Sequence, residues 1–238
     1  MKVLGVITAR GGSKGIPGKN IKSLLGKSLI WWTIDAAQKS GVFDRLIVST
    51  DDEAIAKVCR EFGVEVPFMR PKELAQDKTP HLPVMQHAVS YLKEKEGYSP
   101  DYVMILQPTS PARQAFHIKE AVDLIMKTGA DSVLSVYEMP ENFHPHKALI
   151  ISEDGMLKTV TGAPVRTRAI RRQDLPKAYW SVGAIYLFKT GLLFDTEPSF
   201  YGDRVAPYVL DQKYVVDINE LADWPVAEEA MRKIQNDK

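Results

Sequence analysis

Short apolar runs alternate with amphipathic segments through the first half of the chain. The runs, which we expect to form strands, cover residues 2–8, 45–49, 64–69, 102–106 and 131–137. The segments between them place apolar residues at helical spacing and cover residues 28–40, 52–62, 83–95 and 114–127. Strands that alternate with helices of about 10 to 15 residues favour a parallel sheet covered on both faces. The sequence therefore predicts an α/β fold that binds ligands beyond the carboxyl ends of its strands.

Residues suited to end helices stand at the borders of these segments. Ser28, and either Asp51 or Asp52, are expected to cap helix N-termini, because their side-chain oxygens can accept hydrogen bonds from first-turn amides. Gly41 and Gly129 are expected to end helices, because glycine adopts the left-handed conformation there at little cost. The borders and the periodicity thus agree on where the helices lie.

The pattern changes after about residue 138. Residues 147–151 and 156–160 flank a turn and are expected to pair as a hairpin. The elements expected beyond the hairpin are strands at 184–188 and 214–218 and a closing helix at about 222–234. Because no repeat, low-complexity tract or linker divides the chain, we interpret residues 1–238 as a single domain with an excursion at about 138–178.

The overall composition is that of a globular protein without a strong charge bias. Hydrophobic residues make up 45% and charged residues 26% of the 238 positions, and the formal net charge is +1. So small a charge gives no global field for a nucleic acid polymer or a membrane surface, and no apolar run approaches the roughly 18 residues of a membrane-spanning helix. The single cysteine, Cys59, excludes an intrachain disulfide and is consistent with a cytoplasmic location.

A glycine-rich loop at residues 9–20 follows the first predicted strand. It holds four glycines with Arg10, Lys14 and Lys19, and the first 27 residues carry six Lys or Arg but no Asp or Glu. Glycines let the backbone approach a ligand, and cations without nearby acids suit a polyphosphate. The loop is not a Walker loop, since Asn20 follows the lysine, nor a dinucleotide-binding fingerprint, since no Gly-x-Gly occurs. A solvated surface loop is the alternative interpretation.

Five strings in this sequence resemble the acylneuraminate cytidylyltransferases, also called CMP-sialic acid synthetases. They are ITARGGSKGIPGKN at residues 7–20, RPKELAQDKT at 70–79, LQPTSP at 106–111, RQDLP at 172–176 with GAIY at 183–186, and VDINELADW at 216–224. They follow the order of that family and cover nearly the whole chain. The resemblance implies a three-layer Rossmann-like nucleotidyltransferase fold with a mostly parallel central sheet and a small dimerisation arm.

The resemblance also implies which residues bind the nucleotide. Arg10 and Lys19 would neutralise the triphosphate and the leaving pyrophosphate, and we expect them to be catalytic. Arg70 and Thr79 would help to read cytosine, although a surface ion pair for Arg70 and a helix cap for Thr79 are equally good explanations without the resemblance. The other residues implied in this site are Ala9, Gly11, Gly12, Ser13, Lys14, Asn20 and Asp77. Among them, Ser13 and the amides of the two glycines would bind phosphate oxygens.

The acceptor site is expected at the loop that begins with Gln107 and at a basic loop. Gln107 is neutral, so it is suited to bond sugar hydroxyls without repelling an anion. Residues 161–177 carry five cations against one acid, and an arginine fork matches the two oxygens of a carboxylate. The residues implied to contact the sugar are Gln107, Thr109, Ser110, Arg171, Arg172, Gln173 and Tyr186. The alternatives are solvated loop charge and a turn in which Ser110 caps the next helix.

Asp217 ends a predicted strand and is followed closely by Asn219. Carboxylate oxygens beside phosphates suit Mg²⁺, and the resemblance implies Asp217 and position 219 as ligands of Mg²⁺ or Mn²⁺, with Asp217 also catalytic. The family typically has Asp at both positions, so Asn219 removes one negative charge. Asp223 is better explained as a charge at the start of the last helix. Val182 stands where the family often has Asn, which changes a sugar contact or a pocket wall.

We therefore expect an enzyme that joins CMP, taken from CTP, to the anomeric hydroxyl of an acidic nonulosonic sugar of the sialic acid type. The expected cofactor is Mg²⁺ or Mn²⁺. The expected assembly is a homodimer, in which the resemblance implies that the arm reaches the partner's sugar site. Two alternatives stay open: CMP transfer to an eight-carbon ulosonate or a phosphonate, and a non-catalytic nucleotide-binding protein, which Asn219 alone favours.

Overall fold

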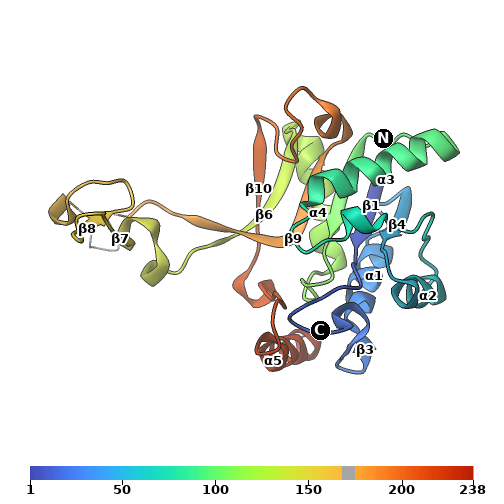
Figure 1. The fold of residues 1–238 in the computed structure, drawn as a ribbon, viewed down its shortest axis with the longest axis horizontal. Coiled ribbons are helices and arrows are strands. Elements are labelled where there is room, and N and C mark those ends of the chain that lie inside the picture. Colours follow the sequence, from blue (N-terminus) through green and yellow to red (C-terminus); the bar gives the residue numbers. More distant parts are fainter. Residues whose placement is uncertain (168–174, 238) are drawn as a thin grey trace.

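The computed structural model describes residues 1–167 and 175–237, and its centre is a six-stranded sheet with the order β10-β6-β9-β5-β1-β4 (Figure 1). The strands are β1 (Val3–Thr8), β4 (Arg45–Ser49), β5 (Tyr102–Leu106), β6 (Ser132–Glu138), β9 (Tyr179–Lys189) and β10 (Val205–Val209). β4, β1 and β5 pair in parallel, as do β6 and β10, while β9 runs antiparallel between the two groups. The predicted mostly parallel sheet is therefore confirmed.

Alternate side chains of the central strand β1 pack on opposite faces of the sheet. The helices are α1 (Leu29–Ser40), α2 (Glu53–Glu61), α3 (His81–Glu96), α4 (Ala115–Thr128) and α5 (Asp223–Asn236). Val3 and Ile7 share a core with residues of α1, α2 and α4, whereas Leu4 and Val6 share another with residues of α3. Strands buried on both faces are apolar along their whole length. The predicted three-layer α/β arrangement is confirmed.

The helices begin and end within two residues of the positions expected from the sequence. Asp52 caps α2, because its carboxylate accepts hydrogen bonds from the amides of Ala54 and Ile55 at 2.8 and 3.0 Å. Ser28 stands before α1, but its side chain makes no capping hydrogen bond, so that expected contact is wrong. Gly41 ends α1 with a φ of 66°, the left-handed conformation that favours glycine.

Two expected strands do not belong to the described sheet, and one strand was not expected. Residues 64–69 make only isolated bridges, from Glu65 and Met69 to β4 and the residue after it. Residues 214–218 follow a short 3-10 helix and instead bring Ile218 into the core beneath α5. β10 was missed because it contains Pro207, which is tolerated at the edge of a sheet.

A hairpin stands away from the sheet. β7 (Leu149–Ile151) pairs antiparallel with β8 (Leu157–Thr159), as predicted. Figure 1 shows this pair at the far end of the long connection between β6 and β9, and we call it the arm. Ile151 and Met156 are exposed apolar residues of the arm. A two-stranded hairpin buries too little surface to be stable alone, so the arm needs a covering surface.

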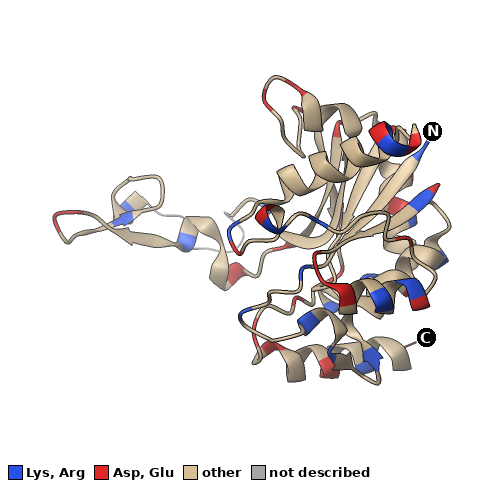
Figure 2. Ribbon diagram, turned by 45° about the vertical axis from the view of Figure 1, so that its right-hand side comes forward, with Lys and Arg blue, Asp and Glu red and all other residues tan. Residues whose placement is uncertain are grey.

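The remaining elements are short. β2 (Ser23–Leu24) and β3 (Lys27–Ser28) form a small hairpin before α1. The 3-10 helices are η1 (Lys19–Ile21), η2 (Lys72–Leu74), η3 (Glu141–Phe143), η4 (Pro145–Lys147), η5 (Val165–Thr167), η7 (Thr190–Phe194) and η8 (Gln212–Tyr214). Across the described ranges, no helix has the length and apolar character needed to cross a bilayer. Basic and acidic positions are interspersed along the ribbon (Figure 2), in keeping with the small net charge.

Candidate active site

The carboxyl ends of β1 and β5 open into a first cavity of about 280 Å³. It is lined by Thr8, Arg10, Ser13, Lys19, Asn20, Arg70, Leu74, Gln76, Asp77, Thr79, His81, Val84, Gln107, Pro108 and Thr109. Most residues implied in the nucleotide site therefore line one cavity. The exceptions belong to the glycine-rich loop but not to the cavity wall, and they are Ala9, Gly11, Gly12 and Lys14.

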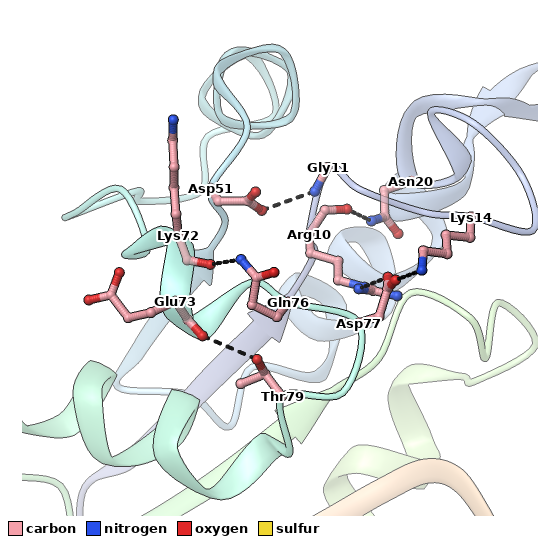
Figure 3. A network of polar contacts seen from close by, with 10 residues as sticks. All are labelled: Arg10, Gly11, Lys14, Asn20, Asp51, Lys72, Glu73, Gln76, Asp77 and Thr79. Carbon is pink, nitrogen blue, oxygen red and sulfur yellow. Dashed lines mark hydrogen bonds and ion pairs between the residues drawn. The ribbon is translucent and has the colours of Figure 1, made fainter.

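Two cations of the glycine-rich loop share one carboxylate (Figure 3). Arg10 Nη1 donates to Asp77 Oδ1 at 2.6 Å, and Lys14 pairs with the other oxygen of Asp77. The hydrogen bond from Lys14, followed by that from Arg10, lowers the pKa of Asp77. Asn20 Nδ2 donates to the Arg10 carbonyl at 2.9 Å and holds the loop from inside. Asp77 thus pairs with the cations that are expected to meet a triphosphate.

Gly11 is fixed by the two aspartates that follow β4. Its amide donates to Asp51 Oδ1 at 3.0 Å, and a Cβ at this position would overlap the Asp52 carboxylate. Because Asp52 also caps α2, only glycine lets the loop cross the start of that helix. The Gly11 amide, expected to face a phosphate, is therefore engaged by Asp51, whereas a Cβ on Gly12 would meet nothing within 4 Å.

Arg70 is buried and is held by β4. Its Nε donates to Ser49 Oγ at 3.0 Å, and its Nη2 donates to the Ser49 carbonyl. Burial lowers the pKa of Arg70 to about 10, against the opposite effect of the Asp51 carboxylate. Arg70 is therefore not the surface residue of the alternative interpretation. Thr79 does not cap α3 either, since its hydroxyl donates to the Glu73 carbonyl at 3.2 Å.

His81 also lines this cavity, although the sequence pattern did not indicate it as a site residue. It is the first residue of α3, and its Nε2 lies 3.4 Å from Thr8 Oγ1. Burial, and then the Arg70 cation, lowers the pKa of His81, so the imidazole is neutral at neutral pH. A neutral imidazole offers one donor and one acceptor. The available signal was a histidine directly after Pro80, at the start of a predicted helix.

Lys19 joins the glycine-rich loop to the segment before α5. Its Nζ donates to the Ile218 carbonyl at 3.0 Å. Burial lowers the pKa of Lys19, while the Asp217 carboxylate acts in the opposite direction. A Cβ on Gly15 would come within 2.9 Å of the Asn219 carbonyl, so loop and segment approach each other at a second point. Lys19 therefore brings a positive charge from the first cavity toward Asp217.

A second cavity, of about 330 Å³, shares Gln107 with the first. It is lined by Gln107, Ser110, Tyr137, Trp180, Ser181, Val182, Gly183, Ala184, Tyr186, Tyr214, Val215, Val216 and Asp217. Four of these thirteen residues are tyrosine or tryptophan, and Asp217 is the one charged side chain among the described residues of the wall. Burial raises the pKa of Tyr186, so its hydroxyl stays protonated and can donate a hydrogen bond.

The residues expected to contact the sugar fall into three groups. Gln107, Ser110 and Tyr186 line the second cavity, whereas Thr109 lines the first. The residues that lie outside the described ranges are Arg171, Arg172 and Gln173. Ser110 does not cap α4, whose N-cap is Gln114, and instead closes a turn through its amide and the Gln107 carbonyl at 3.3 Å. The turn of the alternative interpretation is thus present without the cap.

The second cavity lies against an irregular stretch of β9. The register between β6 and β9 shifts between Leu134 and Val136, so that residues 182–185 bulge out of the ladder. The buried Ser135 hydroxyl fills the gap and accepts a hydrogen bond from the Ile185 amide at 2.8 Å. The bulge supplies part of the cavity wall. Neither the bulge nor Ser135 was expected, because a serine inside a predicted strand gives no sign of a register shift.

Asp217 and Asn219, the expected metal ligands, are hydrogen-bonded to each other. Asn219 Nδ2 donates to Asp217 Oδ2 at 2.7 Å. Asp223 accepts from the amides of Asn219 and Glu220 at 2.8 and 2.9 Å, in keeping with a charge at the start of α5. In the part of the chain described here, no three His, Cys, Asp or Glu residues are grouped to enclose a metal ion. Mg²⁺ takes few protein ligands and keeps several waters, so Asp217 beside bound phosphates fits it.

This chain is similar in sequence to known cytidylyltransferases. Residues 4–215 match the Cytidylyltransferase family. The chain is 34% identical over 226 residues to an N-acylneuraminate cytidylyltransferase of Streptococcus agalactiae, with 94% of this chain and 52% of the relative covered. It is 32% identical over 227 residues to a pseudaminic acid cytidylyltransferase of Campylobacter jejuni, with 95% of each chain covered.

The chain thus spans about half the length of the N-acylneuraminate relatives and nearly the full length of the pseudaminic acid relative. A solved structure of a CMP:2-keto-3-deoxy-manno-octonic acid synthetase complexed with CTP shares the fold, with a TM-score of 0.68 at 15% identity and with 98% of this chain and 99% of that chain covered. The family expected from the five strings is confirmed. By fold and by sequence, this chain belongs to the cytidylyltransferase family.

Proposed function

We propose that the protein transfers CMP from CTP to the anomeric hydroxyl of an acidic nonulosonic sugar and releases pyrophosphate. The observation that carries the proposal is a pair of cavities that share Gln107, the first lined by three cations and the second by four aromatic residues, with Asp217 as its one described charge. Relatives named for N-acylneuraminate and for pseudaminic acid support the same class of acceptor. CTP would fill the first cavity and the sugar the second, with the α-phosphorus near Gln107.

In this reaction one oxygen–phosphorus bond forms as another breaks. The anomeric oxygen attacks the α-phosphorus in line, the bond to the β-phosphate oxygen breaks, and the hydroxyl proton passes to water. Arg10 and Lys19 would stabilise the charge that gathers on the leaving pyrophosphate, so the protein acts by positioning and charge stabilisation. Arg10 would exchange Asp77 for the phosphates, which carry more negative charge than one carboxylate.

A divalent cation fits beside Asp217. When bound, Mg²⁺ or Mn²⁺ would supply positive charge to the phosphate oxygens. Asp217 would hold the ion with one oxygen, and Asn219 would steady the other oxygen through its amide hydrogen bond at 2.7 Å. In this proposal Asn219 orients the ligand and does not replace the second acid of the family.

The carboxylate of the acceptor requires a cation that the described wall of the second cavity lacks. We assign this role to Arg171 or Arg172 of the basic loop at residues 161–177. The arm would bring that loop to the cavity of a second copy in a homodimer. Its exposed apolar residues, among them Ile151 and Met156, support this assembly, because such residues gain from being covered. A light-scattering mass of one chain at assay concentration would exclude the dimer.

A cytoplasmic location goes with this function. Cys59 is buried, and burial raises the pKa of its thiol to about 12. Such a thiol is unreactive, and a chain with a single cysteine has no intrachain disulfide that would require an oxidising compartment.

The proposed reaction is tested by pyrophosphate release. The purified protein is supplied with Mg²⁺, one nucleoside triphosphate and one acid from a panel of N-acetylneuraminate, legionaminate, pseudaminate, an eight-carbon ulosonate and a phosphonate, with a neutral hexose as control. We expect release with CTP and at least one nine-carbon acid, and little with UTP or ATP, because Arg70 and Thr79 line the first cavity and would read the cytosine base there. Release with the ulosonate or the phosphonate alone, or with the hexose, would contradict the assigned acceptor class.

A further inference from the structure

Arg113 is a buried arginine that the proposed reaction does not use. It follows the turn that begins at Gln107, stands just before α4, and is 2% exposed. Its described partners are two backbone carbonyls, and no described carboxylate pairs with it. A buried cation without an acid costs stability, so its presence calls for a physical reason.

The two carbonyls belong to different elements of the site. Arg113 Nε donates to the Ala184 carbonyl of β9 at 2.7 Å, and its Nη2 donates to the Gln107 carbonyl at 2.5 Å. Ala184 lies in the bulge, where the described registers with β5 and β6 assign it no paired residue. Arg113 therefore satisfies a carbonyl that the bulge frees and ties the bulge to the Gln107 turn.

The cost of this contact is visible around the guanidinium. Burial lowers the pKa of Arg113 to about 9. Its Nη1 is buried and has no hydrogen-bond partner in the described part of the chain. The neighbouring His117 adds no second positive charge, because burial and then the Arg113 cation lower the pKa of this imidazole to about 4 and keep the ring neutral. An apolar side chain would avoid the buried charge but would also remove the donor of both carbonyls, so the arginine is explained by the contact it makes between the bulge and the turn.

The Arg113 guanidinium makes its two hydrogen bonds close to the residue that the two cavities share. Gln107 is the residue they share, and a Cβ on Gly183 would come within 2.9 Å of Gln107 Oε1. Gly183 is the neighbour of Ala184 in the bulge. The Gln107 side chain therefore touches the bulge at the point where Arg113 joins their backbones. A change in the Arg113 fork would move Gln107 relative to both cavities.

We propose that Arg113 is a positioning residue that sets the distance between Gln107 and the β9 bulge and so aligns the acceptor with the nucleotide. The inference rests on the proposed function. Arg113 lines neither of the two cavities, so it acts through Gln107 and not on a substrate. Its loss should therefore disturb the acceptor more than CTP, which is also held by the glycine-rich loop.

The first test removes the guanidinium group of Arg113 and keeps most of its aliphatic side chain. In R113M we expect kcat/KM for the sugar acid to fall about 100-fold, through both a higher KM and a lower kcat, because a displacement of about 1 Å can have that effect. The KM for CTP should change less than about twofold. The matched control is R204M, since Arg204 Nη2 also donates to a backbone carbonyl, that of Thr128 at 3.1 Å, but lines neither cavity. Equal losses for both substrates in R113M would overturn the proposal.

A double-mutant cycle separates positioning from general destabilisation. In a Gln107→Ala background, R113M should change kcat/KM by less than about twofold, because the Gln107 side chain that Arg113 positions is already removed, although the backbone carbonyl at 107 remains. If the two losses multiply instead, Arg113 does not act through Gln107. If R113M fails to fold, Arg113→Lys takes its place and should show the same split between KM and kcat with a smaller loss. A lysine variant with wild-type constants would overturn the proposal.

A structural readout keeps this inference separate from the proposed function. If the wild-type protein releases no pyrophosphate with any acid of the panel, the proposed function fails, and Arg113 is judged by crystal structures of the wild type and the variant. Movement of the Gln107 turn away from Ala184 by about 1 Å in the variant would support the positioning role. An unmoved turn would overturn it, whatever the reaction is.

Discussion

The two cavities are built in different ways. The first is held by a polar network, in which Arg10 is paired with Asp77 and Arg70 is fixed on Ser49. The described wall of the second contains four aromatic residues and part of the β9 bulge, and its one charge is the negative charge of Asp217. Under the proposed function, the nucleotide site would be nearly complete within one chain, whereas the acceptor site would need a cation from outside the described wall.

Removing the Lys19 charge should have the largest effect. In Lys19→Ala we expect kcat/KM for CTP to fall about 100- to 1,000-fold, because a preorganised group that stabilises transition-state charge contributes about 3–4 kcal/mol. Pyrophosphate release under subsaturating CTP measures this. Lys57→Ala, at an exposed position of α2, serves as the control and should be unchanged. A Lys19→Ala enzyme within twofold of the wild type would take Lys19 out of the site.

The pH dependence of kcat/KM tests the role of the Lys19 charge in a second way. Because burial lowers the pKa of Lys19, its positive charge is lost at a lower pH than that of a free lysine. The value of kcat/KM, which reports the free enzyme, should therefore decline with rising pH below the ordinary lysine value of 10.5. Lys19→Arg should shift this decline to higher pH, and an unshifted decline would assign it to another group.

Variants of Asp217 and Asn219 distinguish a metal site with one protein ligand from a metal site with two. In Asp217→Ala we expect the half-saturating Mg²⁺ concentration to rise by about tenfold or more, since the only proposed protein ligand is lost. Asn219→Asp should lower that concentration, because a carboxylate is restored beside the ion. Glu220→Ala, at an exposed acid that lines neither cavity, is the control. Normal metal dependence in Asp217→Ala would remove the site from this segment.

Substitutions in the basic loop should change the KM for the sugar acid and leave the KM for CTP unchanged. Replacing Arg171 or Arg172 with Lys keeps the charge but loses the fork, so the variant of the contacting residue should show about a tenfold higher KM for the sugar acid. The KM for CTP should stay constant. Arg166→Lys provides a control within the same loop. Unchanged sugar KM values in both variants would mean that the acceptor carboxylate is bound elsewhere, and the contrast between the cavities would lose its explanation.

Asp77 should have the smallest effect, and in the favourable direction. In the free protein it pairs with Arg10 and Lys14, for which a triphosphate must compete. Asp77→Asn should therefore lower the KM for CTP by up to about fivefold, as expected for exposed ion pairs, and salt should weaken the effect. Asp35→Asn removes another exposed pair, with Lys39, as the control. A higher KM in Asp77→Asn would mean that Asp77 helps to hold the nucleotide.

Most of the fold follows from local sequence, and the exceptions have physical causes. The buried strands β1, β4 and β5 are continuous apolar runs, so periodicity and length identify them. Residues 64–69 form a similar run, but Val64 and Phe68 are buried in different cores, and the segment makes only bridges to the sheet. Residues 214–218 form another mostly apolar run, yet Val216 and Ile218 pack in the core beneath α5, whereas Val215 packs against the core shared by α1, α2 and α4. In both segments, tertiary packing determines that the residues do not join the sheet as strands. The local sequence pattern carries no information about that packing.

The site was predictable where it follows the backbone and not where it depends on distant contacts. The carboxyl ends of parallel strands meet at one edge, so the loops after β1 and β5 had to lie together. The contact of Gly11 with Asp51 spans 40 residues and that of Ser135 with Ile185 spans 50, and no spacing rule announces either. His81 was missed because a lone histidine at a helix start does not reveal that the helix begins at a cavity.

β9 is one continuous strand of eleven residues that serves two parts of the molecule. Ile185 and Leu187 anchor one end in the core, while Tyr179 and Trp180 are exposed where the strand leaves for the arm. Trp180 also lines the second cavity. If the arm docks on a second copy as proposed, and this docking holds Trp180 in one position, docking also favours one shape of the second cavity. By thermodynamic reciprocity, a sugar that binds that shape would then strengthen the docking by the same factor. In that case, dimer formation and sugar binding would be linked equilibria, each measurable through the other.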